Sequence, residues 1–369
     1  MSMYTIGNDL YSGRLSFKII QHRKIWFGIA GVIVLISLLS FVVKTPNLGI
    51  EFRGGSQFTI SGISNQNQQL AYDVIAKEGN DQAPRVSNLG ASGMRVQTVQ
   101  LNNEQTAAVK EALAKAYNVP ANAVTSTFVG PSWGADIMNK AIRAMIVFMV
   151  AVSLVLIIYF RSWTIAVGAS GALLHDFIVT LGVYWILGLE ITPATIIGIL
   201  TIMGYSLYDT VVVFDKVREN TQQLNKQLRY TYEESANLAI NQTLIRSLNT
   251  SLTGLLPVLS VLIIGVWIFG ADTLRDLALV MFVGMLLSTI SSIFIAAPLA
   301  VTLGMRRPDI KEHTQHVYEV RSAVSSDVDG SSLSKNDSDM LNYVAEHERQ
   351  AGSHQGVKAQ PKRKNRSKR

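Results

Sequence analysis

The sequence has no cysteine, and this absence narrows the available chemistry. Disulfide bonds, thiolate metal sites and thiol nucleophiles are excluded. The six histidines include no H-E-x-x-H motif, and the chain has no P-loop, no glycine-rich phosphate cradle and no nucleophile–base pair. We therefore expect no metal site, no cofactor and no catalytic residue, and we predict that the protein is not an enzyme.

Charged residues are also scarce. They make up 16% of the 369 residues, whereas 48% are hydrophobic, and the mean hydropathy is positive. This balance indicates a membrane protein rather than two soluble domains. The net charge of +7 is explained by the last twelve residues, Lys358 to Arg369, which carry seven Lys or Arg and no acid. This is a basic tail on a membrane protein, not a nucleic-acid-binding domain.

Six apolar runs predict a polytopic α-helical membrane protein with six transmembrane helices. The first run, Ile25–Val43, has 19 uncharged residues, enough to cross a hydrocarbon core of about 30 Å. No small-x-small cleavage site follows it, so we interpret it as a retained span and not as a signal peptide. The later runs are Ala144–Phe160, Thr164–Leu189, Ile191–Phe214, Leu252–Phe269 and Leu277–Leu303.

Basic residues flank these runs unevenly. One side of the membrane receives Arg14, Lys18, Arg23, Lys24, Arg161, Lys216, Arg218, Lys226, Arg229, Arg306 and Arg307. The other side receives mainly acids, among them Glu190, Asp272 and Asp276. The positive-inside rule therefore predicts that both termini are cytoplasmic. The predicted division is a cytoplasmic segment 1–24, a first helix 25–43, an external domain 44–140, five helices in 141–305 with a cytoplasmic connection at 215–250, and a largely disordered tail 306–369.

The external segment is long enough to fold by itself. Strand patterns at Gln57–Ile60, Pro84–Leu89, Met94–Val99 and Thr125–Phe128 are interrupted by helical patterns at Gln66–Lys77 and Asn103–Tyr117. Asn102 is a suitable N-cap for the second helix. The order β-α-β-β-α-β predicts a small α+β domain of ferredoxin-like fold, which alone does not define an activity.

Two cytoplasmic segments allow more than one interpretation. The connection Asp215–Thr250 is amphipathic, and could bind a partner or pack under the bundle. From Asp309 onward apolar residues become rare, which predicts disorder. The basic cluster at the end of this tail could contact anionic lipid or ribosomal RNA, or could simply keep the chain soluble.

An acid, Asp209, lies inside the fourth apolar run. Placing such a group in a membrane costs roughly 2.5–3.5 kcal/mol on insertion scales, so it is a candidate functional residue. The alternative is that it lies near the helix end and reaches headgroup water. Helical spacing puts Tyr205 on the face of Asp209, with Ser206 beside them. His175 and Asp176 form a second polar pair, near the middle of the third run.

A possible counter-charge for Asp209 is Arg246, which precedes the fifth run and shares a stripe with Thr250. The two charges lie at similar depth, so they would pair if their helices were neighbours. Such a pair suits proton coupling, because a carboxylate that loses its cation in a dry site takes up a proton. The alternatives are a static salt bridge, or an arginine that anchors to lipid phosphate. Asp176 is either a second relay acid or only a partner of His175.

Four segments carry a resemblance to a known family. They are GIEFRGG at 49–55, His175-Asp176, GYSLYDTVVVFDKVREN at 204–220 and the polar entry to the fifth run at 241–253. Together with the six-span topology, they resemble the SecF family of the bacterial Sec protein-export machinery, within the resistance-nodulation-division superfamily. The similarity covers roughly residues 14–305.

The resemblance implies a subunit of the bacterial plasma (inner) membrane that works with SecD at the Sec translocon channel. Together they would use the proton-motive force to promote preprotein translocation, surrounded by membrane lipids. It implies Asp209 and Arg246 as proton-relay residues, with a further acid on SecD. It also marks an external motif that contains Glu51, Phe52, Gly54 and Gly55. Glu51, Tyr208 and Ser247 differ from the family pattern, and the last two are expected to touch the relay site.

The sequence is also compatible with two other functions. One is a small-molecule or lipid exporter of the same superfamily, although such exporters usually have about twelve spans and two external domains in one chain. The other is a structural subunit that moves no protons.

Overall fold

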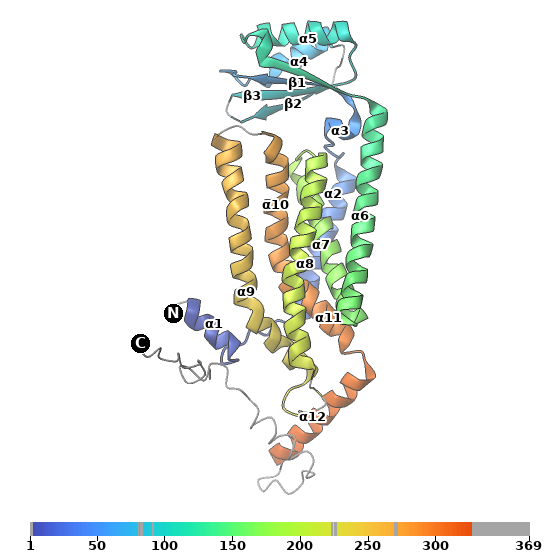
Figure 1. Cartoon of the computed structure of the whole chain (residues 1–369), viewed down its shortest axis with the longest axis vertical. Helices are drawn as coiled ribbons and strands as arrows, with labels where there is room; N and C mark the ends of the chain where they lie inside the picture. Colours follow the sequence, from blue (N-terminus) through green and yellow to red (C-terminus); the bar gives the residue numbers. More distant parts are fainter. Residues whose placement is uncertain are drawn as a thin grey trace, which may run out of the picture.

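The computed structural model describes residues 3–79, 81, 84–90, 92–222, 224, 227–268 and 272–326. A bundle of long helices carries a small α/β domain at one end, and α1 (Met3–Tyr11) and α12 (Pro308–Ser326) lie toward the other end (Figure 1).

Six helices in the described residues are long and apolar enough to cross a membrane, which confirms the predicted number of spans. They are α2 (Arg23–Val43), α6 (Pro131–Phe160), α7 (Trp163–Leu187), α8 (Pro193–Thr221), α9 (Tyr232–Ser260) with a π-helix at Val261–Ile268, and α10 (Asp272–Ser291) with a π-helix at Ser292–Ala296 and then α11 (Ala297–Gly304). Many residues of α2 and α6 that face outward are apolar, as expected for a surface in contact with lipid.

The cytoplasmic connection predicted at Asp215–Thr250 is much shorter in the structure. α8 continues to Thr221 and α9 already begins at Tyr232, after a capping box in which Thr231 and Glu234 bind each other's backbone N–H groups. The hydropathy pattern placed the end of the fourth helix too early, because the helix continues through charged residues that lie beyond the apolar run.

The first half of α9 packs under the bundle and is not a free partner-binding helix. Ala236 and Ala239 are completely buried. The side-chain amides of Asn237 and Asn241 donate to the carbonyl oxygen of Phe17, at 3.0 and 2.9 Å. These bonds fix the segment that precedes α2 against α9.

The α/β domain has the predicted order of elements: β1 (Gly55–Ser61), α4 (Gln68–Glu78), β2 (Arg85–Leu89), β3 (Gly93–Thr98), α5 (Asn103–Ala116) and β4 (Val124–Val129). The sheet order is β2-β3-β1-β4 and all neighbours are antiparallel, which confirms the ferredoxin-like topology. α4 and α5 lie on the face of the sheet away from the bundle (Figure 1). Asn102 caps α5 as predicted, in a reciprocal capping box with Gln105.

The tail differs from the prediction over its first part. Disorder was expected from Asp309 onward, but α12 is helical through Ser326. Its Val317 and Val320 are buried against Leu228, and Arg321 forms an ion pair with Glu234 at 2.7 Å. The basic cluster Lys358–Arg369 lies outside the described residues.

Candidate functional site

Asp209 is buried in the bundle, where α8 packs against the chain that continues α10. Its side chain is 4% exposed, and its Oδ2 accepts a hydrogen bond from Ser292 Oγ at 2.7 Å. Ser292 is the first residue of the π-helix that interrupts this span. π-helical turns inside α-helices occur frequently at functional sites. Asp209 therefore does not reach headgroup water, and the alternative of a solvated helix end is not supported.

The second acid, Asp176 on α7, lies in the same part of the bundle and is 3% exposed. Its Oδ2 accepts hydrogen bonds from Ser291 Oγ at 2.7 Å and Ser206 Oγ at 3.1 Å, and its Oδ1 lies 3.2 Å from His175 Nδ1. Ser291 and Ser292 are neighbours in the sequence, and each binds a different acid. Two carboxyl groups on α7 and α8 are thus joined to consecutive residues at the end of α10.

The predicted ion pair between Asp209 and Arg246 is not present among the described residues, although their helices are neighbours as required. Tyr205 Oη donates to the Thr250 carbonyl at 2.8 Å, and the Asn220 amide donates to Gln242 Oε1 at 3.0 Å. Along the two helices, these bonds link α8 to α9 on either side of Asp209 and Arg246. However, Arg246 is exposed while Asp209 binds Ser292.

The supporting residues predicted from the sequence play different parts. Ser206 is completely buried and binds Asp176, whereas Tyr205 joins α8 to α9. Thr250 accepts the hydrogen bond from Tyr205 with its backbone carbonyl, while its own hydroxyl donates to the Arg246 carbonyl. Tyr208 was expected to touch the relay site, but it is 56% exposed on the outside of the bundle.

The external motif forms a close joint between the bundle and the α/β domain. α3 (Ile50–Arg53) buries Phe52 in the same apolar core as the membrane helices. Gly54 and Gly55 have φ values of 74° and 131°, and a Cβ on Gly55 would lie 2.4 Å from the Thr98 carbonyl oxygen. Glycine is required at Gly55 because the backbone of β3 occupies the place of a side chain. The buried Glu51 Oε2 has no hydrogen-bond partner among the described residues.

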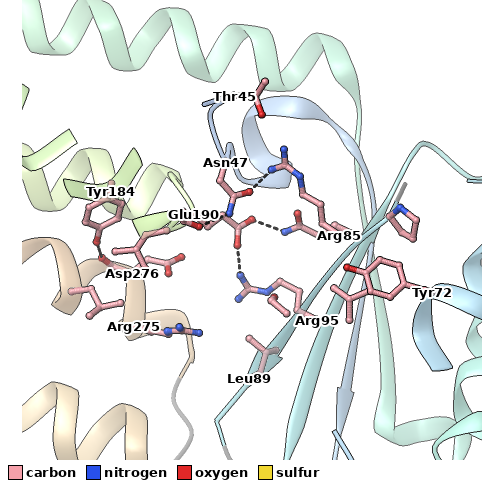
Figure 2. A pocket seen from close by; sticks show the side chains of 17 residues that line it. Thr45, Asn47, Tyr72, Arg85, Leu89, Arg95, Tyr184, Glu190, Arg275 and Asp276 are labelled. Carbon is pink, nitrogen blue, oxygen red and sulfur yellow. Dashed lines mark hydrogen bonds and ion pairs between the residues drawn. The ribbon is translucent and has the colours of Figure 1, made fainter. Parts of the chain in front are cut away.

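A polar cavity of about 460 Å³ lies where the α/β domain meets the ends of the helices (Figure 2). Glu190, between α7 and α8, accepts bonds from Arg95 Nη1 at 2.9 Å and Gln97 Nε2 at 2.6 Å, both on β3. Arg85 on β2 donates to Asn47 and to the Leu48 carbonyl. Burial and the nearby Arg53 lower the pKa of the Arg85 guanidinium. Sequence reasoning missed this joint, because it depends on how the two parts dock.

The Arg95–Glu190 ion pair should stabilise this docking measurably. Both side chains are about five-sixths buried, at 17% and 16% exposure, so water screens their attraction weakly. A double-mutant cycle of Arg95→Gln and Glu190→Gln should give a coupling of about 1–3 kcal/mol, as is usual for contacting polar residues. Hydrogen exchange of the β3 amides in the full chain measures it as a local opening free energy.

The matched control is the exposed pair Arg307–Asp309, with side chains 51% and 55% exposed. Its coupling, measured at the α12 amides, should be only about 0.2–1 kcal/mol. A coupling for Arg95–Glu190 no larger than that of the control would contradict a stabilising role at the joint.

The described residues contain no group of three His, Cys, Asp or Glu side chains that could hold a metal ion. Two histidines of α12, His313 and His316, are at H-x-x-H spacing. His313 Nε2 instead binds the Gln227 carbonyl at 2.9 Å.

Six membrane-length helices, one ferredoxin-like domain and a pair of buried acids define a polytopic membrane protein with a polar site in its bundle. The family model for the C-terminal part of the protein-export membrane proteins SecD/SecF matches residues 108–306, and the SecD/SecF GG-motif model matches residues 39–61. The chain belongs to the SecF family of protein translocase subunits.

Relatives of known name agree with this assignment. The chain is 41% identical over 318 residues to the protein translocase subunit SecF of Streptomyces coelicolor, covering 86% of this chain and 84% of that one. It is 30% identical to SecF of Escherichia coli O157:H7 over 311 residues, covering 82% of this chain and 93% of that one. The crystal structure of SecDF, a translocon-associated membrane protein from Thermus thermophilus, matches with a TM-score of 0.71 and 29% identity. That match covers 79% of this chain and 39% of the longer SecDF chain.

Proposed function

We propose that this chain works with a SecD-type partner to use the proton-motive force for preprotein translocation through the Sec translocon channel. The observation that carries the proposal is the pair of buried acids, Asp209 and Asp176, which are held by serine hydroxyls. A buried carboxylate without a cation is costly, whereas a protonated one that keeps its hydrogen bonds is tolerated. Asp209 therefore favours different surroundings before and after a proton arrives.

Arg246 is the group that would distinguish these two states. It lies on the neighbouring helix α9, between the two bonds that link α8 to α9. An ionised Asp209 would draw Arg246 inward. Protonation of Asp209 would end this attraction, and the Asp209 side chain would then bind Ser292. Moving one charge through the membrane potential supplies about 2.3 kcal/mol per 100 mV, enough to bias two helix arrangements. The π-helices at Val261–Ile268 and Ser292–Ala296 are segments where α9 and the α10 span could shift.

A SecD-type partner is supported by exposed residues of α8 and α9 and by the SecDF relatives. Arg246 on α9 and the large side chain of Tyr208 on α8 are both exposed. The solved SecDF chain is much longer than this one, and the match covers only 39% of it. The partner would supply a further acid, so that the relay is shared between two chains.

The bacterial plasma membrane is the location that fits this role, with both termini in the cytoplasm. Arg161 follows α6, Arg218 is near the end of α8 and Arg307 directly precedes α12. These ends of the elements lie opposite the α/β domain (Figure 1), which supports this orientation. The proposed subunit is not an enzyme, and it would contact the preprotein and membrane lipids. The basic tail would contact anionic lipid or the ribosome.

Translocation into inverted membrane vesicles tests the proposal. Vesicles that contain the translocon, the full chain and its SecD-type partner should import more preprotein while a proton gradient is present. An ionophore should remove the gain. An equal gain without the gradient would favour a structural subunit, and transport of a drug or lipid by the chain alone would favour an exporter. Mass spectrometry of proteins copurified with a tagged chain identifies the partner.

A further inference from the structure

A second cavity, of about 320 Å³, lies at the end of the bundle opposite the α/β domain. Three arginines from different elements line it. Arg161 is in the turn between α6 and α7, Arg218 is near the end of α8, and Arg307 directly precedes α12. None of these residues belongs to the buried acid site.

The charges in this cavity are not balanced. The one acid on its wall, Asp309, pairs with Arg307 at 2.7 Å. Arg161 and Arg218 form no ion pair with any described residue. Two guanidinium groups that line one cavity without a carboxylate partner among the described residues would stabilise an anion bound there.

The backbone conformation at Arg161 is unusual for an arginine. Arg161 ends α6 in the left-handed conformation, with φ at 50°. Glycine or asparagine is favoured at such a position, and an arginine there is at a conformational disadvantage. A glycine at this position would therefore remove the charge without straining the backbone.

The other donors on the wall suit a phosphate group. The N-cap of α7, Ser162, makes no capping bond to the backbone, and its hydroxyl lies 3.0 Å from that of Thr164. The first N–H groups of this 25-residue helix are therefore not satisfied by a cap. Guanidinium groups, hydroxyls and a helix N-terminus together are typical of phosphate binding.

We propose that this cavity binds the phosphate of an anionic phospholipid from the adjacent membrane leaflet. A lipid is favoured over a free phosphate by the place of the cavity at the ends of membrane spans. Phe160 is the last residue of α6, and Trp163, at the start of α7, is 59% exposed. Tryptophan at a span end is typical of the headgroup region. The proposal does not depend on the proposed proton-coupled function.

The test is titration of the purified full chain with phosphatidylglycerol, with phosphatidylcholine as the neutral lipid, followed by native mass spectrometry. Phosphatidylglycerol should bind more tightly, and the double variant Arg161→Gln/Arg218→Gln should bind it about thirtyfold more weakly. Arg161→Gly should lose about fivefold in affinity. Because glycine favours a positive φ, this variant should unfold at the same or a higher temperature, so its loss is not explained by misfolding.

The matched control is Arg306→Gln, which removes the same charge beside the cavity without touching its wall. It should change the affinity by less than about twofold. An equal loss in this control, or full binding by Arg161→Gly and the double variant, would overturn the site. Inorganic phosphate that binds as tightly as phosphatidylglycerol would overturn the lipid as its ligand.

Discussion

Asp209→Asn should abolish the proton-dependent part of translocation while the protein still folds and assembles with its partner. Asparagine has nearly the same shape, and its Oδ1 can still accept the hydrogen bond from Ser292. It cannot become charged, so a proton no longer changes the attraction between this position and Arg246. The gradient-dependent gain in imported preprotein should fall by more than about tenfold, as is usual when a proton-transfer group is removed.

The assay compares import into inverted vesicles with and without an ionophore, together with copurification of the partner. Asp215→Asn is the control, because Asp215 is an exposed acid on the same helix whose contact is with Tyr159. It should leave the gain unchanged. Arg246→Met should behave like Asp209→Asn. Normal gradient-dependent import by both Asp209→Asn and Arg246→Met would rule out the relay and leave a structural subunit.

The positions of the spans were predictable because an apolar run of about twenty residues has few other structures available to it. The ends of the helices were not. Lys216 and Arg218 belong to α8, although they lie beyond the apolar run. The sequence did contain a sign of the next start, since Thr231 and Glu234 stand at capping-box spacing.

The ferredoxin-like domain was predictable because its signals are local. Asn102 caps α5, and the glycines around position 92 join β2 to β3. The joint between this domain and the bundle was not predictable in the same way. Glu190 binds Arg95 although the two residues are 95 positions apart in the sequence, and no local pattern predicts which charged residues of the domain and the bundle would pair.

The acids of the candidate site were found because an ionisable residue in an apolar run is rare. Ser206, one partner of Asp176, was also singled out, but Ser291 and Ser292 were missed because serine is common in membrane helices and bonds readily to its own backbone. Only the packing of α7, α8 and α10, with a π-helix beginning at Ser292, directs Ser291 to Asp176 and Ser292 to Asp209.

Gly55→Ala should unfold or displace the start of β1, with a loss of at least about 3 kcal/mol in stability of the α/β domain. Its Cβ would lie 2.4 Å from the Thr98 carbonyl oxygen, and φ is 131°. The obstacle is backbone and cannot rotate away. Thr98 is paired with Ser56 in the sheet, and its hydroxyl binds Asp81 at 2.8 Å. Relief therefore requires β1 and β3 to separate.

Hydrogen exchange of the full chain in detergent measures this effect, with faster exchange expected in β1 and β3 and unchanged exchange in the membrane helices. Gly62→Ala is the matched control, because Gly62 also has a positive φ, 75°, but no atom lies within 4 Å of its Cβ position. It should cost only about 1 kcal/mol, the penalty for a side chain in the left-handed region. The difference between the two variants isolates the contact with Thr98. If β1 and β3 were as well protected from hydrogen exchange in Gly55→Ala as in Gly62→Ala, the positive φ alone would account for the glycine. The close approach of Gly55 to the Thr98 carbonyl would then not require glycine.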